Sequence, residues 1–234
     1  MDVIHGYETT FPIPLGLSCT WDMGLIERSA QIAAQEASAD GINWTFSPMV
    51  DVSRDPRWGR VSEGSGEDPY LGSQIAKAMV NGYQQRDLSK NNSILACVKH
   101  FAAYGAAIAG RDYAAVDMSE NTLWEYYLPP FKAGLDAGAA TFMNSFNTLN
   151  GIPATGNTYL QRDILKGKWN FDGFVITDWA YIREMINWGF AEDGAEASLK
   201  AVEAGADMDM ESHLYVYELT KLVKEGKVDE KLID

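Results

Sequence analysis

Short apolar runs alternate along the chain with longer segments whose apolar residues recur at helical spacing. The apolar runs span residues 2–5, 44–50, 94–100, 141–146, 174–177 and 206–210. The helical segments lie near residues 23–39, 69–86, 119–137, 157–168, 193–204 and 212–225. Such a series of strand–helix units predicts a parallel sheet covered by helices.

Several predicted helices carry start and stop signals. Asp68 stands before Pro69, as a capping acid stands before a first-turn proline. The adjacent prolines Pro129 and Pro130 are expected to break the 119–137 segment in two. The remaining signals are N-cap and C-cap residue types, namely Ser119, Asn157 and Asp193 at helix starts and Gly205 and Gly226 at helix ends.

The number of units favours an α/β fold of the (β/α)₈ barrel type. A complete barrel has eight units in about 250 residues, whereas this chain offers six in 234. We therefore expect a TIM-barrel-like fold that is incomplete, with residues 1–234 forming one domain. "MDVIHG" enters a strand at once and "KVDEKLID" ends in helix-compatible sequence, so both ends are expected to be truncated. A doubly wound sheet is the rival fold, but no GxGxxG follows any strand.

Composition and charge exclude several classes of protein. The net charge of −14 argues against nucleic-acid binding and against anionic membranes, since both require a positive surface. The two cysteines form no CxxC pair and the three histidines are scattered, so neither a disulfide framework nor a metal site is expected. No run reaches the ~18 apolar residues of a membrane span, and no secretory signal opens the chain.

Polar residues gather directly after the predicted strands, where a barrel builds its active site. Asp178 is the most informative, because it ends the apolar run 174–177 and is followed by Trp179. Lys99 and His100 end another run, although a strand end reaching water is an alternative reading of this pair. The arginines of "DVSRDPRWGRVSEGSGEDP" are equally open to pairing with the acids of that loop. The acids of "DMDMES" also read as a solvated helix start.

The residue types at these positions limit the classes of ligand that the site can bind. The chain has no phosphate-binding glycine loop, no GxSxG and no HExxH, so no cofactor is expected. Acids, cations and aromatic residues together suit a small neutral carbohydrate, and sugar cleavage requires a carboxylate near the anomeric carbon. Trp21, Trp44 and Trp58 are expected to pack in the interior rather than to contact a ligand.

The chain resembles glycoside hydrolase family 3, the β-glucosidase and exo-β-glycosidase group. The resemblance is carried, in order along the chain, by "DVIHGY", "FPIPLGL", "PMVDVSRDPRWGRVSEGSGEDPYLG", "ACVKHF", "GRDY", "YLPPF", "LNGIPAT", "NFDGFVITDW" and "AGADMDM". It implies a retaining hydrolase for terminal β-D-glucosyl residues, of the bacterial periplasmic type, with Asp178 as the nucleophile. It also implies substrate-binding roles for Asp2, Arg60, Lys99, His100, Trp179 and, more weakly, Arg111. Arg60, Lys99 or His100 near Asp178 is expected to lower the pKa of that carboxyl.

Some residues depart from the family pattern. Phe146 in "NSFN" replaces a tyrosine, so any hydrogen bond from that hydroxyl to Asp178 is absent. Ile108, Ala114 and Ala115 replace residues that are often polar, so the aglycone side is expected to be altered. The resemblance also implies that the general acid/base is a glutamate of a following α/β sandwich domain, and that relatives are periplasmic or secreted.

Two alternative functions follow from these departures. The first alternative is a truncated barrel that at most binds sugar and that self-associates through exposed strand edges. An N-acetylhexosaminidase is a lower-ranked second, since "KHFAAYG" lacks the loop histidine of that branch.

Overall fold

A computed structural model describes residues 1–233, and its centre is a three-stranded parallel sheet. The strands are β1 (Cys97–Phe101), β2 (Thr141–Asn144) and β5 (Phe174–Ile176), in the order β1-β2-β5. All their residues are buried except Phe174, which is half-buried. Burial on both faces explains why these strands read as continuous apolar runs rather than as alternating patterns.

The other three predicted strands are wrong as regular strands, although they lie where parallel strands belong. Residues 44–50 and 206–210 form only isolated parallel bridges, Trp44 to Leu95, Met49 to Lys99 and Met208 to Ile176. Pro48 has no N–H with which to continue a ladder. In the segment 2–5, the amide of Val3 donates to the side chain of Thr45 instead of to a strand carbonyl. The six runs nevertheless form an α/β, TIM-barrel-like arrangement.

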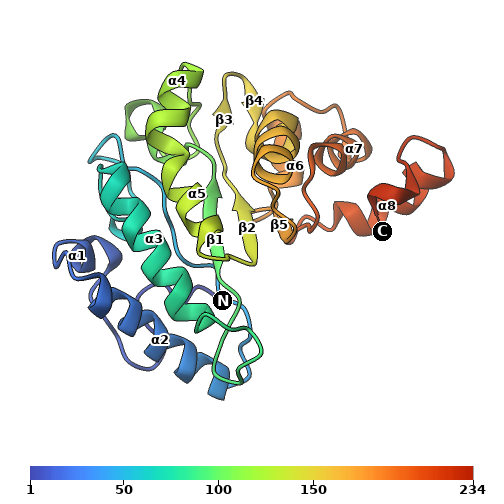
Figure 1. The fold of residues 1–234 in the computed structure, drawn as a ribbon. Helices are drawn as coiled ribbons and strands as arrows, with labels where there is room; N and C mark the ends of the chain where they lie inside the picture. Colours follow the sequence, from blue (N-terminus) through green and yellow to red (C-terminus); the bar gives the residue numbers. More distant parts are fainter. Residues whose placement is uncertain (234) are drawn as a thin grey trace.

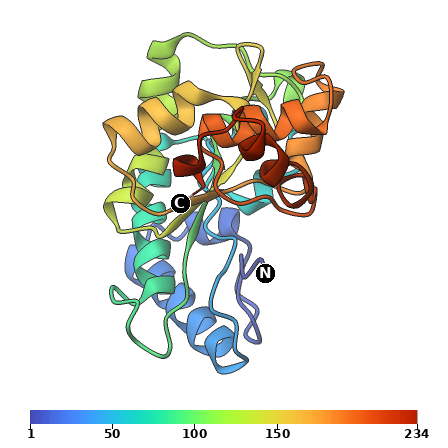
Figure 2. The same cartoon turned by 90° about the vertical axis from the view of Figure 1, so that its right-hand side faces the viewer.

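The predicted helices lie in the expected places and cover the sheet (Figure 1). They are α2 (Met23–Ala39), α3 (Pro69–Gln84), α5 (Pro129–Asp136), a π-helix (Tyr159–Lys168), α7 (Gly194–Ala204) and α8 (Leu214–Lys224). Figure 1 shows α2, α3 and α5 side by side on one flank and α6 to α8 on the other, and Figure 2 shows the same layers from the side.

The predicted helix signals are confirmed. The side chains of Asp68, Ser119 and Asp193 accept hydrogen bonds from the first turns of their helices, and Asn157 accepts one from Leu160. Gly205 ends α7 with a φ of +106°, which a glycine adopts without strain. The break in the 119–137 segment falls directly before Pro129, as expected.

Several short elements were not predicted. They are α1 (Pro14–Ser18), α4 (Glu120–Thr122), a π-helix (Leu123–Tyr127), α6 (Tyr181–Asn187), the hairpin of β3 (Thr148–Leu149) and β4 (Ile152–Pro153), and five 3₁₀ turns. Those turns are Val61–Glu63, Tyr104–Ala106, Ile108–Gly110, Ala154–Gly156 and Glu230–Leu232. Most of them lie in loops, whose turn chemistry gives a weak periodic signal.

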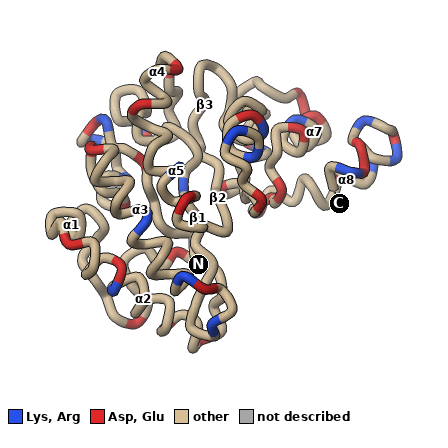
Figure 3. Tube along the Cα trace, in the orientation of Figure 1, with Lys and Arg blue, Asp and Glu red and all other residues tan. Residues whose placement is uncertain are grey.

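The surface carries the acidic excess in a dispersed form. Figure 3 shows acidic residues along the chain from α1 to α7 rather than on one acidic face. Within residues 1–233, none of the helices combines the length and the apolar character that crossing a bilayer demands.

Candidate active site

The carboxyl ends of the parallel segments bring several predicted site residues together. Lys99 and His100 lie in the last three residues of β1, and Asp178 follows β5 by two residues. The ammonium of Lys99 lies 2.8 Å from a carboxylate oxygen of Asp2. Nε2 of His100 lies 3.4 Å from Oδ2 of Asp178, and Nδ1 of His100 lies 2.8 Å from Oδ2 of Asp51. Four segments far apart in sequence thus meet around one histidine.

Asp178 is a largely buried carboxyl at this meeting point. Its side chain is 14% exposed, and Oδ1 accepts the backbone N–H of Trp179 at 2.7 Å. Burial raises its pKa to about 6, and the hydrogen bond from Trp179 and the charges of Lys99 and Arg60 only partly oppose this rise. The expected lowering of this pKa is therefore wrong, because desolvation exceeds the attraction of the nearby cations.

His100 and Asp51 form a fully buried pair behind Asp178. Oδ2 of Asp51 accepts the backbone N–H of His100 at 2.9 Å and also contacts its ring, which turns Nε2 toward Asp178. Burial, together with the charges of Arg60 and Lys99, holds the pKa of His100 well below its ordinary value. Burial raises the pKa of Asp51 to about 7. His100 is therefore neutral and does not supply the cation expected beside Asp178.

The two cations of the site are each paired with an acid. Arg60 makes a two-pronged ion pair with Glu63, at 2.7 and 3.0 Å, and lies 5.6 Å from the ring centre of Tyr104. Glu63 also lies 4.0 Å from Lys99. Arg60 is thus paired with an acid of its own loop, which was one of the two readings of the sequence. This pairing holds Arg60 near the carboxyl end of β1.

Aromatic side chains lie close to Asp178 in the sequence or in space. Trp179 is 63% exposed. Tyr113 packs its ring on buried Phe146 with centroids 4.4 Å apart. The charge of Asp178 contributes, after burial, to raising the pKa of Tyr113, which indicates that the two groups are near one another. Arg111 is exposed, and within residues 1–233 its side chain makes no hydrogen bond or ion pair with these groups.

Sequence reasoning missed the pairing of Asp51 with His100 and the contact of Tyr104 with Arg60. Asp51 was considered only as a loop partner for arginine, yet it directly follows the run 44–50 and so carried the same positional signal as Asp178. Tyr104 lies in an unpredicted 3₁₀ turn and had no such signal.

The other predictions about polar and aromatic residues are confirmed only in part. Among the acids of "DMDMES", Asp209 accepts hydrogen bonds from Ser212 and from the N–H of Tyr215 in the first turn of α8, whereas Asp207 pairs with Lys166 and serves no helix start. Trp58 is buried as expected, but Trp21 is 76% exposed, so its expected packing is wrong. Across residues 1–233, no three His, Cys, Asp or Glu side chains are arranged to hold a metal ion.

Comparison with known proteins gives consistent matches over the whole chain. Residues 1–234 match the family described as "Glycosyl hydrolase family 3 N terminal domain". The chain is 46% identical to a periplasmic beta-glucosidase of Salmonella typhimurium, over 97% of this chain and 30% of that protein. It is 37% identical to a beta-xylosidase of Formosa agariphila, over 88% of this chain and 29% of that protein.

A solved structure matches equally well. The beta-glucosidase from Listeria innocua in complex with isofagomine is 51% identical and superimposes with a TM-score of 0.97, over 99% of this chain and 33% of that chain. This chain therefore spans about a third of the length of the relatives it matches.

Proposed function

This chain belongs to glycosyl hydrolase family 3, and from that premise we propose that it forms the catalytic barrel of a retaining β-glucosidase. The enzyme would remove terminal non-reducing β-D-glucosyl residues through a covalent glycosyl-aspartate intermediate. The observation that carries the proposal is Asp178, a carboxyl held at the mouth of the sheet beside His100 and an exposed tryptophan.

Asp178 is the proposed nucleophile. Its carboxylate attacks the anomeric carbon as the bond to the leaving oxygen breaks, and water later hydrolyses the resulting ester. The attacking form is the carboxylate, so the pKa of about 6 requires a pH above that value for full nucleophilicity. Nε2 of the neutral His100 ring lies 3.4 Å from Oδ2, and the N–H of Trp179 holds the other oxygen of the carboxyl.

The charged residues beside Asp178 are proposed to bind the glycone. Carboxylates accept hydrogen bonds from sugar hydroxyls, and ammonium and guanidinium groups donate to them. Asp2 and Lys99 already form a pair that presents both kinds of partner, and Arg60 presents its remaining N–H groups beside them. Trp179 offers an exposed ring face for the sugar's C–H side, and Arg111 stays a proposed outer contact.

The proton donor to the leaving group is proposed to come from chain outside these residues. Relatives are about three times as long as this chain. Within residues 1–233, none of the carboxyl groups facing Asp178 is free of a partner: Asp2 is bound to Lys99 and Asp51 to His100. Without acid assistance, natural glycosides should react about 10²–10⁴-fold more slowly.

An activated 2-deoxy-2-fluoro glucoside tests the proposal, because its leaving group departs without protonation. We expect intact-mass measurement to show one added fluoroglucosyl group on the protein and none on Asp178→Asn. Asp172→Asn is the matched control, since Asp172 is an exposed acid just before the same strand. A folded protein that acquires no adduct would favour the inert barrel. An adduct that persists in Asp178→Asn would place the nucleophile elsewhere.

A β-xylosidase is the second candidate, because a relative 37% identical carries that name. Comparing rates of adduct formation by the fluoroglucoside and the fluoroxyloside decides between them. A faster reaction with the xyloside would overturn the glucosidase assignment and leave Asp178 as nucleophile.

Organisation and location are proposed on the same basis. Residues 1–234 match one family domain and are proposed to act as one unit. A relative at 46% identity is named periplasmic, which supports a periplasmic or secreted enzyme. The substrate is proposed to be a small β-glucoside or oligosaccharide.

A further inference from the structure

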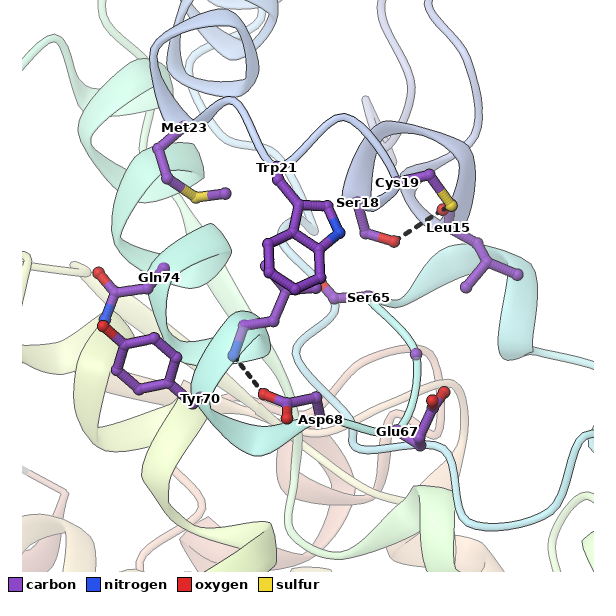
Figure 4. A pocket seen from close by; sticks show the side chains of 12 residues that line it. Leu15, Ser18, Cys19, Trp21, Met23, Ser65, Glu67, Asp68, Tyr70 and Gln74 are labelled. Atoms are coloured by element: carbon purple, nitrogen blue, oxygen red, sulfur yellow. Dashed lines mark hydrogen bonds between the residues drawn. The ribbon is translucent and has the colours of Figure 1, made fainter.

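A pocket lies between α1, the start of α2 and the first turns of α3. Its volume is about 570 Å³, within the range of small-molecule sites. Figure 4 shows Trp21 reaching across it, with Tyr70 and Gln74 on one side and Leu15 and Cys19 on the other. Trp21 and Tyr70 are 76% and 73% exposed. Two large aromatic rings thus face an open cavity.

Polar groups without partners face the same cavity. Within residues 1–233, the hydroxyl of Ser65, the carboxylate of Glu67 and the amide of Gln74 make no hydrogen bond or ion pair with protein groups. Asp68 differs, because one of its oxygens caps α3 through the N–H of Leu71 at 2.6 Å. The pocket therefore offers a donor and several acceptors that the fold does not use.

The backbone and the ring of Trp21 have different roles. Its backbone φ is +56°, and its N–H donates to the carbonyl of Ser18 at 3.3 Å in the turn that ends α1. The indole, which remains 76% exposed, gains little from the hydrophobic effect. A large aromatic ring left exposed beside a cavity is typical of positions that bind a ligand.

The chemistry of the lining selects the ligand class. No Lys, Arg or His lines the pocket, and two acids do, which disfavours phosphates and carboxylates as ligands. Flat aromatic faces beside carboxylate, amide and hydroxyl groups suit a neutral polyhydroxylated ring.

Its walls come from α1 and the start of α2, which follow the segment 2–5, and from the loop and first turns of α3, which follow the segment 44–50. Along the chain, the turn Val61–Glu63, which packs on α1, lies between Arg60 and the wall residues Ser65 to Asp68.

We propose that this pocket is a second carbohydrate-binding site, which holds one sugar ring of a β-linked glycan on Trp21 and Tyr70. The choice of a sugar as ligand rests on the proposed function. The site is separate from the Asp178 site and performs no chemistry. It retains a longer glycan beside the loop 51–68, which carries both Arg60 and the pocket residues Ser65 to Asp68.

Titration of cellotetraose into the non-hydrolysing variant Asp178→Asn tests the proposal. In ¹H–¹⁵N spectra, the indole N–H resonance of Trp21, assigned by its loss in Trp21→Phe, is expected to shift with saturation. Trp21→Ala and Tyr70→Ala should each weaken this binding about tenfold, as expected for removal of an aromatic platform. Tyr126→Ala is the matched control, because Tyr126 is also an exposed tyrosine outside the pocket.

The outcomes separate this proposal from the catalytic one. An unshifted Trp21 resonance, or equal affinities for Trp21→Ala and Tyr126→Ala, would overturn the second site while adduct formation at Asp178 stands. If the Trp21 resonance shifts but the parent protein forms no adduct at Asp178, the second carbohydrate-binding site stands and the proposed hydrolase activity is overturned. Glu67→Ala, an exposed side chain without fold contacts, provides a further variant if Trp21→Ala does not fold.

Discussion

Replacing Asp178 by asparagine is expected to stabilise the protein while abolishing adduct formation. The pKa of Asp178 is raised from 3.8 to about 6 because the carboxyl is buried. The folded protein therefore binds a proton at this group more tightly than the unfolded chain does. The stability contribution of Asp178 is greatest below pH 3.8 and is lost as the pH rises through about 6.

The magnitude follows from the two pKa values. Their difference, at about 1.4 kcal/mol for each pH unit, corresponds to a cost of about 3 kcal/mol for the ionised carboxyl at pH 7.5. Asparagine has the same shape, accepts the N–H of Trp179 equally well and carries no charge. We expect Asp178→Asn to gain most of this free energy of unfolding at pH 7.5, and less than about 1 kcal/mol at pH 4.

Urea unfolding of the parent protein and the variant at both pH values measures this difference. In a separate thermal unfolding experiment at pH 7.5, the same gain in free energy of unfolding should raise the melting temperature by about 5–10 °C for a domain of this size. Comparing variant with parent at each pH removes the titration of all other groups. Asp172→Asn, at an exposed position, should show no comparable gain. A gain independent of pH, or a loss at pH 7.5, would refute the claim that burial dominates the electrostatics of Asp178.

Two further predictions concern the surroundings of the nucleophile. Lys99→Met removes a charge that lowers the pKa of Asp178, so the acid limb in the pH–rate profile of adduct formation should move to higher pH, and the affinity for sugar should fall. An acid limb that does not move would contradict the influence of Lys99 on the pKa of Asp178. Gly105→Ala places a Cβ 2.1 Å from the backbone oxygen of Val52 and should lower the free energy of unfolding by about 1–3 kcal/mol in urea titrations, whereas Gly59→Ala, with open space around it, should not.

The sequence predicted the order of the elements well because apolar runs and caps are local signals. The run 174–177 became β5 and the proline pair broke the 119–137 segment as expected. The segment 2–5 failed as a strand because its pairing depends on the side chain of Thr45, a contact 42 residues away. Position at the carboxyl end of an apolar run was enough to find Lys99, His100 and Asp178, although the first two lie inside β1 and only Asp178 follows its strand.

The electrostatics of the site depend on quantities that no local pattern contains. The expected pKa of Asp178 had the wrong sign because sequence shows which charges are present but not how deeply each is buried or how each is paired. Trp21 was misread for a similar reason: tryptophan is buried on average, and only the loop geometry after α1 leaves it exposed. Burial and pairing are properties of the tertiary arrangement.

The site places four acids around two cations. Asp2, Asp51, Glu63 and Asp178 lie near Lys99 and Arg60, so full ionisation would leave a net charge of −2. Burial raises the pKa of Asp51 to about 7 and that of Asp178 to about 6, so both carboxyls take up protons well above their ordinary range. The two carboxyls face the two ring nitrogens of His100, so their titrations are coupled. Protonation of either one therefore reduces the repulsion that the other experiences when ionised.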